Sequence, residues 1–475
     1  MEMFEDSVSK IYQNTVLKSI IKRAWFERMW TIQEVAMSKH SVLICGQRQL
    51  TWADFEAIFI ELGTRGDISV TGSGIYGFID MHIYFRQLYE CATSPWQSRY
   101  TEHRFLLSLS YLRHKQASKP EDKVFALYNL FQAIGITLPN PDYDKAPAKI
   151  FAETAAAIIS ARRSLMLLYL VTGRQVMAEL PSWAPNWNSD LPAVPLIVNN
   201  LLETEYRVSR QSPVVFGFSG SGSHLNLKGM VIDTIIQNIE TIPDTLEKSF
   251  TSIGDGMSSV RIMREWLQAA ASWSARGITR SRDVLGDLFH TIFDIGPSTY
   301  LHGLSARAKS KDPLEVLEGL KRHDFPLWAR LISGQAGCCT HISSPEFRAQ
   351  AAAKMKSDLV GGPLRCDDLD QHEDSLEFAT MLHLEAHNIE CFHSVVAAGA
   401  STGNLILTKS GYIGKAPVSV ELGDVAALIS GMELVMFLRP AHDGYRLIGP
   451  GYLHGLMYGE KWLEDENGLE NIKIL

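Results

Sequence analysis

Cysteine is scarce in this 475-residue chain, and its spacing excludes a disulfide-rich scaffold. No two of the six cysteines form a Cys-x-x-Cys pair, and six are too few to staple a chain of this length. The six are Cys45, Cys91, Cys338, Cys339, Cys366 and Cys391. We therefore expect a reducing compartment and predict a cytoplasmic protein, in which each cysteine acts as a small buried hydrophobic residue.

An excess of positive charge is also missing. Lysine and arginine total 45 against 53 aspartates and glutamates, which gives a formal net charge of −8. A protein with this balance has no general electrostatic attraction to nucleic acid or to an anionic membrane surface. We therefore expect no nucleic-acid partner.

Long uninterrupted apolar runs are absent as well. The two most apolar stretches, 154–171 and 425–438, are interrupted by Arg162, Arg163 and Glu433. Neither supplies the roughly 20 clean residues that cross a bilayer, so no membrane anchor is expected. The first six residues include three acids and no base, which is the wrong charge for a secretory signal.

The overall composition is that of a folded protein, and the N-terminal region is predicted to be helical. Hydrophobic residues make up 46% of the chain and charged residues 21%, and two or three domains are expected at this length. Apolar residues recur every three or four positions over 8–36, which predicts an amphipathic helix. A short strand or turn follows at 42–45, and further helices are predicted at 52–62 (capped by Thr51), 82–92, 105–112 and 123–131.

A proline-rich connector at 139–143 separates this region from a long predicted helix. Pro147 suits the first turn of that helix, which should run to about residue 163. The segment 180–187, Leu-Pro-Ser-Trp-Ala-Pro-Asn-Trp, contains two prolines and cannot form regular helix or central strand. We expect it to be irregular and to bury Trp183 and Trp187.

From residue 206 the pattern changes to short strands separated by glycine-containing turns. The predicted strands are 214–218, 224–230, 231–237, 392–397, 405–409, 412–415, 424–428, 435–439, 445–449 and 452–458. Short, regularly spaced strands favour a small β-barrel or sandwich. Because isolated hairpins are marginal in water, we expect the strands before residue 240 to complete the C-terminal sheet, with the mainly helical middle as an insertion.

The sequence thus predicts an α+β fold in four parts. These are a mainly helical region at 1–138, a helical connector at 139–205, a β-rich module at 206–240 and 391–463, and a mainly helical insertion at 241–390.

Several segments resemble one known family. Residues 23–36, Arg-Ala-Trp-Phe-Glu-Arg-Met-Trp-Thr-Ile-Gln-Glu-Val-Ala, resemble the third characteristic motif of the fungal heterokaryon incompatibility (HET) domain. Residues 122–130, Asp-Lys-Val-Phe-Ala-Leu-Tyr-Asn-Leu, resemble the element that closes this domain, and Pro141-Asp142-Tyr143 the segment after it. The Trp-rich segment 180–187 and the glycine-punctuated strands after residue 408 are similar to later parts of such proteins.

Two elements that usually open the family's domain do not occur in this sequence. They are an Ala-Leu-Ser-Tyr-x-Trp-Gly strand and a Trp-Ile-Asp-x-Leu-Cys-Ile-Asn-Gln element, which belong to a front half likened to the Toll/interleukin-1 receptor fold and its NAD-consuming relatives. The resemblance therefore implies a HET domain without its N-terminal half.

The resemblance also implies a function: fungal nonself recognition and programmed cell death, carried out through a protein partner or self-association, without a cofactor and without catalysis in this form. Two alternatives stay open. One is an NAD-hydrolysing enzyme whose missing half comes from upstream sequence or a partner chain. The other is a non-functional truncated paralogue.

The motif residues themselves are expected to be structural. Trp25 and Trp30 should anchor a helix, and Gln33 lies beside Glu34, the candidate catalytic carboxylate, although a buried structural carboxylate is the simpler interpretation. Asp122 suits an N-cap or a first-turn acid, with Lys123 after it. Trp183 and Trp187 complete the set of family-motif positions.

Three further patterns are weighed and set aside. Gly72–Gly77 fits Gly-x-Gly-x-x-Gly but lacks the flanking strand and helix of a dinucleotide site. Gly399–Gly403 fits Gly-x-Ser-x-Gly, yet the residues that follow are strand-like, so a hairpin turn is the better interpretation. His383 and His387 share a helix face, but Glu385 between them does not follow the zincin order. No cofactor and no metal site are therefore predicted.

Overall fold

A computed structural model gives the fold of the 475-residue chain. The structure describes residues 23–64, 85–86, 99–111, 113, 115–171, 173, 177–189, 205–220, 222–241, 253–293, 321–322, 325–333, 393, 396–397, 399–400, 403–463 and 468–475. These fall into two compact units. Unit 1 comprises Met1–Val171, Gln175–Ala193 and Phe218–His224, and unit 2 comprises Thr172–Arg174, Val194–Gly217 and Leu225–Leu475. The four-part division expected from the sequence stays a prediction.

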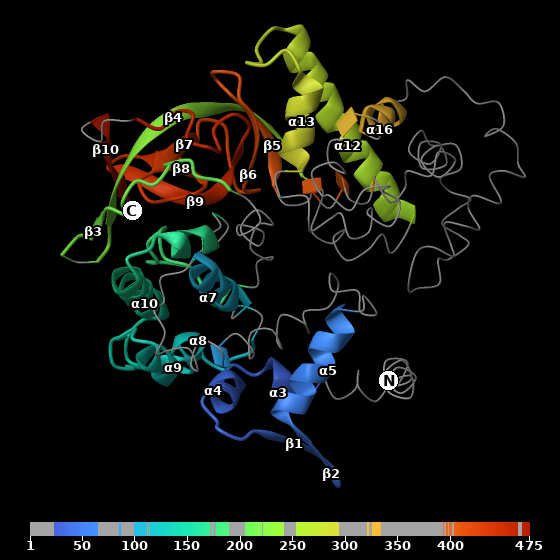
Figure 1. The fold of residues 1–475 in the computed structure, drawn as a ribbon. Coiled ribbons are helices and arrows are strands. Elements are labelled where there is room, and N and C mark those ends of the chain that lie inside the picture. The colour runs from blue at the N-terminus through green and yellow to red at the C-terminus, as the bar shows by residue number, and fades with distance from the viewer. Residues whose placement is uncertain are drawn as a thin grey trace, which may run out of the picture. The chain divides into compact units, whose positions relative to one another are not determined.

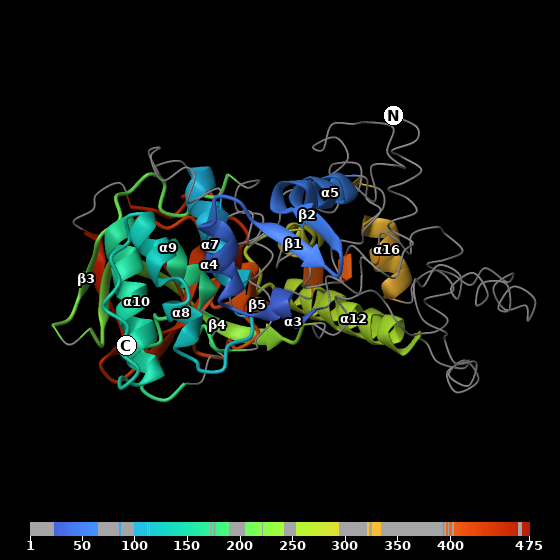
Figure 2. The same cartoon turned by 90° about the horizontal axis from the view of Figure 1, so that it is seen from below.

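Unit 1 is mainly helical (Figure 1). Its elements are α3 (Ala24–Glu27), α4 (Thr31–Ala36), β1 (Val42–Cys45), β2 (Arg48–Thr51), α5 (Trp52–Thr64), α7 (Arg99–Tyr111), α8 (Asp122–Phe125), α9 (Tyr128–Ala133), α10 (Pro147–Arg162) and the 3-10 helix η2 (Met166–Leu170). Strands β1 and β2 form an antiparallel hairpin, which Figure 2 shows beside α5. At its end Thr51 caps α5, since its Oγ1 accepts from the Asp54 N–H at 3.1 Å.

The prediction of one continuous helix up to residue 36 is wrong. Arg28 is extended, with φ −74° and ψ 138°, and separates α3 from α4. It forms a parallel bridge with Gln116, so pairing with a distant segment replaces the local helical turn. The part of this prediction before residue 23 lies outside the described residues.

The helix predicted over 123–131 is also two helices, α8 and α9. Val124, Phe125, Ala126 and Leu127 are all buried. Four consecutive buried residues exceed the apolar stripe of a single amphipathic helix. A break near Leu127 lets all four side chains reach the core. By contrast, the long helix predicted at 147–163 is confirmed as α10, with Pro147 at its first turn.

The Trp-rich segment 180–187 is irregular and buried, as expected. Trp183 and Trp187 are 0% and 1% exposed. The Trp187 indole meets the Phe151 ring of α10 edge to face, with ring centroids 5.5 Å apart. This contact fixes a segment that has no regular backbone hydrogen bonding to hold it.

Unit 2 combines a sheet with three described helices, α12 (Ile253–Ala275), α13 (Val284–Ile292) and α16 (Phe325–Ile332). Its strands are β3 (Phe216–Phe218, at the unit boundary), β4 (Leu225–Ile239), β5 (Asn404–Thr408), β6 (Ile413–Ala416), β7 (Val425–Ile429), β8 (Val435–Ala441), β9 (Gly444–Leu453) and β10 (Glu470–Ile474). Six of them pair in the order β4-β5-β6-β9-β8-β7, and β7 pairs again with β4. The ring therefore closes into a small barrel, with β3 and β10 added to β4.

The predicted α+β fold with a C-terminal β-barrel or sandwich is confirmed, and the sheet closes as a barrel because β4 joins strands that lie far downstream. Ile239 of β4 pairs with Leu405 of β5, while Met230 pairs with Leu428 of β7. A single strand serves both neighbours because two β-bulges, one between Val231 and Asp233, bend it. The separate strands predicted at 224–230 and 231–237 are therefore one.

Three further details of the β-module differ from expectation. His393, Val396 and Ala397 are helical, so the strand predicted at 392–397 is wrong. The strand predicted at 445–449 and the start of the one at 452–458 are merged in β9. Strand β10 was not predicted, because its five residues are recognisable as a strand only through pairing with β4.

The described helices of the middle region pack on one side of this sheet (Figure 1). Their shared core contains Trp266 of α12, Phe289 of α13 and Trp328 of α16, together with Leu405 and Ile413 of the barrel. Within the part of the chain that the structure describes, no helix is both long and apolar enough to cross a membrane.

Candidate functional site

Lys115 and Gln116, which precede the second family motif, are hydrogen-bonded to the backbone of the first motif. The Met29 N–H donates to the Gln116 carbonyl at 2.9 Å, and the Gln116 N–H donates to the Glu27 carbonyl at 2.6 Å. The Lys115 ammonium donates to the Phe26 carbonyl at 2.6 Å. We call residues 26–29, 113, 115–116 and 122–123 the motif junction.

Lys123, from the second motif, completes the motif junction. Its buried ammonium donates to the carbonyls of Arg113, at 3.0 Å, and of Lys115. Lys115 is 1% exposed, and burial lowers its pKa to about 7 although Glu27 acts to raise it. The motif lysine therefore holds main-chain carbonyls in place, which is a structural task.

Asp122 connects the second motif to the Pro-Asp-Tyr segment. The Tyr143 hydroxyl donates to Asp122 Oδ1 at 2.7 Å, and this bond, with a smaller effect of burial, raises the pKa of Tyr143 to about 12. The Phe125 ring packs edge-on against Tyr143 at 4.9 Å, and the Lys119 ammonium lies 4.7 Å from the Tyr143 ring centroid. Asp122 is the first residue of α8, so it is a first-turn acid and Glu121 is the N-cap.

The other motif residues occupy different environments. Trp25 is half-buried and contacts the rings of Phe26 and Trp52, whereas Trp30 is 37% exposed. Gln33 is half-buried, and Glu34 is exposed on α4 rather than buried. At the motif junction, Lys123 and the backbone of the first motif thus both bond to Lys115, while the Glu34 side chain faces solvent.

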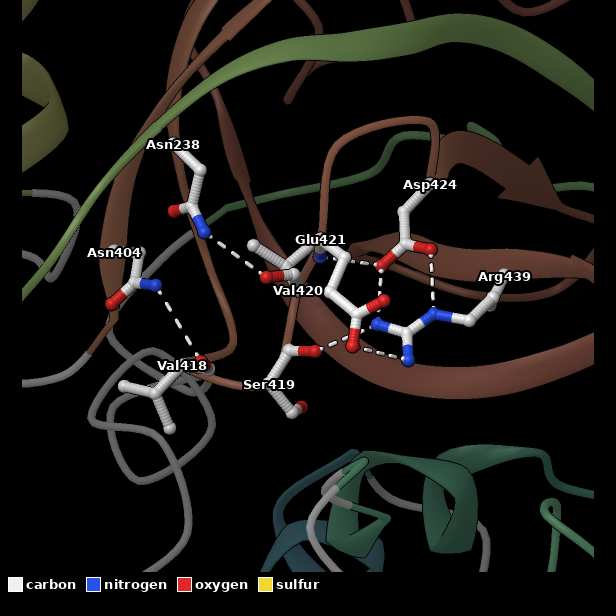
Figure 3. Close-up of polar contacts among 8 residues, drawn as sticks. All are labelled: Asn238, Asn404, Val418, Ser419, Val420, Glu421, Asp424 and Arg439. Atoms are coloured by element: carbon white, nitrogen blue, oxygen red, sulfur yellow. Dashed lines mark hydrogen bonds and ion pairs between the residues drawn. The ribbon is translucent and has the colours of Figure 1, made fainter.

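In unit 2, residues 417–424, which connect β6 to β7, are held by side-chain hydrogen bonds and ion pairs (Figure 3), and we call them the braced loop. Arg439 forms a two-pronged ion pair with Asp424, with Nε–Oδ1 at 2.9 Å and Nη2–Oδ2 at 3.0 Å. Its Nη1 reaches Glu421 at 2.8 Å, and its Nη2 also donates to the Ser419 carbonyl at 2.9 Å. The Asp424 hydrogen bonds, with a smaller opposing effect of burial, raise the pKa of Arg439 above its ordinary value.

Two amides hold the same loop from the opposite side. Asn238 Nδ2 donates to the Val420 carbonyl at 3.0 Å, and Asn404 Nδ2 donates to the Val418 carbonyl at 3.5 Å (Figure 3). The Gly423 N–H donates to the Ile235 carbonyl of β4 at 3.0 Å. The loop is therefore preorganised, and it presents Leu422 with 65% of its surface exposed.

A histidine cluster lies between α13 and the end of β9. Its groups are Asp287 and His290 of α13, Tyr452, His454 and Lys321. His454 Nδ1 is 3.0 Å from the Tyr452 hydroxyl, and its Nε2 is 3.6 Å from Asp287 Oδ1. Burial lowers the pKa of His454, against the effect of the Asp287 charge, and burial likewise raises the pKa of Asp287. The cluster ties a helix of the middle region to the barrel.

Sequence reasoning missed these clusters for a common reason. Asp424, Arg439 and His454 lie in C-terminal segments that resemble the family, but their spacing does not indicate the pairing of Arg439 with Asp424 or of His454 with Asp287, which depends on the closed barrel. Arg113 and Lys115 stand between two predicted helices, where basic residues ordinarily suggest a solvated turn. Among the described residues, no group of three His, Cys, Asp or Glu side chains is placed to bind a metal ion.

Comparison with known proteins supports the family resemblance. Residues 347–468 match the family model described as the Het-6 beta-barrel domain. The chain is 22% identical over 490 aligned residues to "Heterokaryon incompatibility protein 6, OR allele" of Neurospora crassa. This alignment covers 93% of the chain and 65% of the relative, so the chain spans about two thirds of the length of the curated protein that it matches. No solved structure matches the chain. The resemblance to heterokaryon incompatibility proteins is thereby confirmed.

Proposed function

We propose that this chain acts in fungal heterokaryon incompatibility, as a component of nonself recognition that leads to regulated cell death. The observation that carries the proposal is the similarity, over 93% of the chain, to a protein named for heterokaryon incompatibility. The match to the Het-6 barrel family model agrees with it, since residues 403–463 of the matched range form barrel strands and their turns.

We further propose that the chain works through protein contacts rather than through catalysis. The motif residues supply packing and hold main-chain carbonyls, as Lys123 does at the motif junction. The braced loop supports a contact role, because a leucine held on a preorganised turn loses little conformational entropy when a partner covers it. A cytoplasmic location, and contact with either a different protein or a second copy, belong to the same proposal.

The test is a heterokaryon assay. Strains that express the full chain are fused with otherwise isogenic strains of different incompatibility genotype, and growth and vital-dye uptake are measured. We expect slowed growth and cell death that Lys123→Met abolishes, because it removes the donor to two buried carbonyls. Lys149→Met, which changes an exposed lysine on α10, is the matched control.

Equal growth of expressing and non-expressing heterokaryons, at matched protein levels, would contradict the proposed function. The contact mechanism is tested separately by incubating the purified chain with NAD and following nicotinamide release. Robust release that Glu34→Gln eliminates would assign the chain to the NAD-hydrolysing alternative instead.

A further inference from the structure

Arg113 in unit 1 is a buried cation with most of its hydrogen-bonding capacity unmatched. Its side chain is 4% exposed, and its Nη2 donates to the Leu170 carbonyl. Its Nε and Nη1 find no acceptor within the part of the chain that the structure describes. A guanidinium carries one N–H on Nε and two on Nη1, so three buried donors are available to a ligand.

The charge of Arg113 is unmatched as well. Burial lowers its pKa to about 10, and no acidic group in the described parts contributes a counteracting effect. Lys115 and Lys123 are buried beside it and donate to main-chain carbonyls at the motif junction. Burying a cation is unfavourable unless an anion or a full set of acceptors compensates it.

Arg162 of the same unit shows how a buried guanidinium is ordinarily compensated, namely by a carboxylate. Its guanidinium is bonded to the Glu102 carboxylate, which is itself largely buried. The two arginines therefore differ in the charge of their partner: Arg162 has a carboxylate partner, and Arg113 has a single neutral carbonyl. An oxyanion bound at Arg113 would supply the negative charge and the hydrogen-bond acceptors that the Glu102 carboxylate supplies at Arg162.

We propose that Arg113 anchors a binding site for an oxyanion, the phosphate or carboxylate group of a small ligand, at the motif junction. Ionised oxygens form short, charge-assisted bonds with a guanidinium, and the three free N–H groups match the several acceptor positions of such a group. Lys123 adds positive potential from nearby without having to contact the ligand. Binding would stabilise unit 1 by linkage, because the unfolded chain does not assemble the site.

The experiment measures the thermal unfolding of the full chain by tryptophan fluorescence. Inorganic phosphate and, separately, acetate are titrated at constant ionic strength against sodium chloride, so that screening is held fixed. We expect one oxyanion to raise the melting temperature in a saturable way, by roughly 5 °C or more at about 100 times its Kd. A response to phosphate alone identifies a phosphate site, and a response to acetate identifies a carboxylate site.

Two variants decide whether Arg113 is responsible. Arg113→Gln retains a donor for the Leu170 carbonyl and removes the charge, so it should lose the anion response while melting in chloride close to the parent chain. Arg113→Lys keeps the positive charge but replaces the guanidinium with an ammonium, so this variant should bind the oxyanion with weaker affinity. Arg162→Gln is the matched control, and the oxyanion should raise its melting temperature as much as it raises that of the parent chain.

Three results would overturn the proposal. One is a melting temperature that follows chloride and both oxyanions equally. Another is an anion response of the same size in Arg113→Gln. The third is a large destabilisation by Arg113→Gln in chloride without any oxyanion response of the parent chain, which would make Arg113 a clamp for Leu170 and nothing more. None of these results bears on the heterokaryon assay, so the two proposals fail separately.

Discussion

Acidification should destabilise unit 2 through one buried histidine. His393 is 5% exposed and lies between Ser259 of α12 and Trp328 of α16. The Trp328 Nε1–H donates to His393 Nδ1 at 3.1 Å, so Nδ1 must be an acceptor, and the proton of the neutral ring resides on Nε2, 2.8 Å from Ser259 Oγ. A proton added to His393 Nδ1 would point at the Trp328 indole N–H and replace a hydrogen bond with a repulsive contact between two donors. Burial accordingly lowers the pKa of His393 to about 4.

The sign and size of the effect follow from linkage. The unfolded histidine titrates near pH 6.5, so the folded state keeps its full stability above that pH and loses stability as the pH falls toward 4. A difference of about 2.5 pKa units corresponds to about 3 kcal/mol at pH 4, of which about 2 kcal/mol is already lost at pH 5. The loss stops once both states are protonated.

The assay is urea unfolding at pH 7.5 and pH 5.0, monitored by tryptophan fluorescence. The matched variant is His393→Gln, whose amide offers an acceptor to Trp328 and a donor to Ser259 but does not titrate. Between the two pH values the parent chain should lose about 2 kcal/mol more unfolding free energy than the variant. Equal losses in the two proteins would refute the assignment of a buried neutral histidine.

Three further predictions concern the motif junction, the braced loop and the barrel. Lys123→Met should lower the unfolding free energy by about 3 kcal/mol in urea denaturation, because two buried carbonyls lose their donor; a change within error would contradict the structural role of the motif lysine. Asp424→Asn should cost about 2 kcal/mol and make the peptide bonds around Leu422 sensitive to limited proteolysis, whereas an unchanged cleavage pattern would show that Arg439 does not order the loop. Gly229→Val should cost roughly 3 kcal/mol in thermal unfolding, because a Cβ there would lie 2.4 Å from the Leu428 carbonyl of the neighbouring strand; normal stability would mean that β4 and β7 are not closely paired.

The elements that sequence reasoning placed well are those whose signal is local. Strands β5 and β7 lie within one residue of their predicted positions, because β-branched and aliphatic runs end at glycine or polar turns. Pro147 and Thr51 marked the starts of α10 and α5, because helix starts are determined by residues within the first turn.

The failures share one origin, which is contact with residues far away in the chain. The break at Arg28 exists because of Gln116, and β10 exists because of β4. The helical state of His393 accompanies a ring that is held by α12 and α16. Periodicity reports which face of a segment is apolar but not which partner covers that face, so these features could not be predicted from a single sequence.

The position of the helical middle region explains how a long excursion can interrupt a closed barrel. Its two ends lie side by side, since Ile239 pairs with Leu405, and the Thr241 N–H donates to Asn404 Oδ1 at 3.1 Å. The Trp266 indole N–H donates to the Glu240 carbonyl at 2.8 Å and binds α12 to the same point. A segment that leaves the barrel at one strand and returns at the strand paired with it carries an entropic cost of loop closure. This cost grows only logarithmically with the length of the segment. The strand register of the barrel is therefore compatible with large changes in the middle region, provided that the pairing of β4 with β5 and β7 is kept.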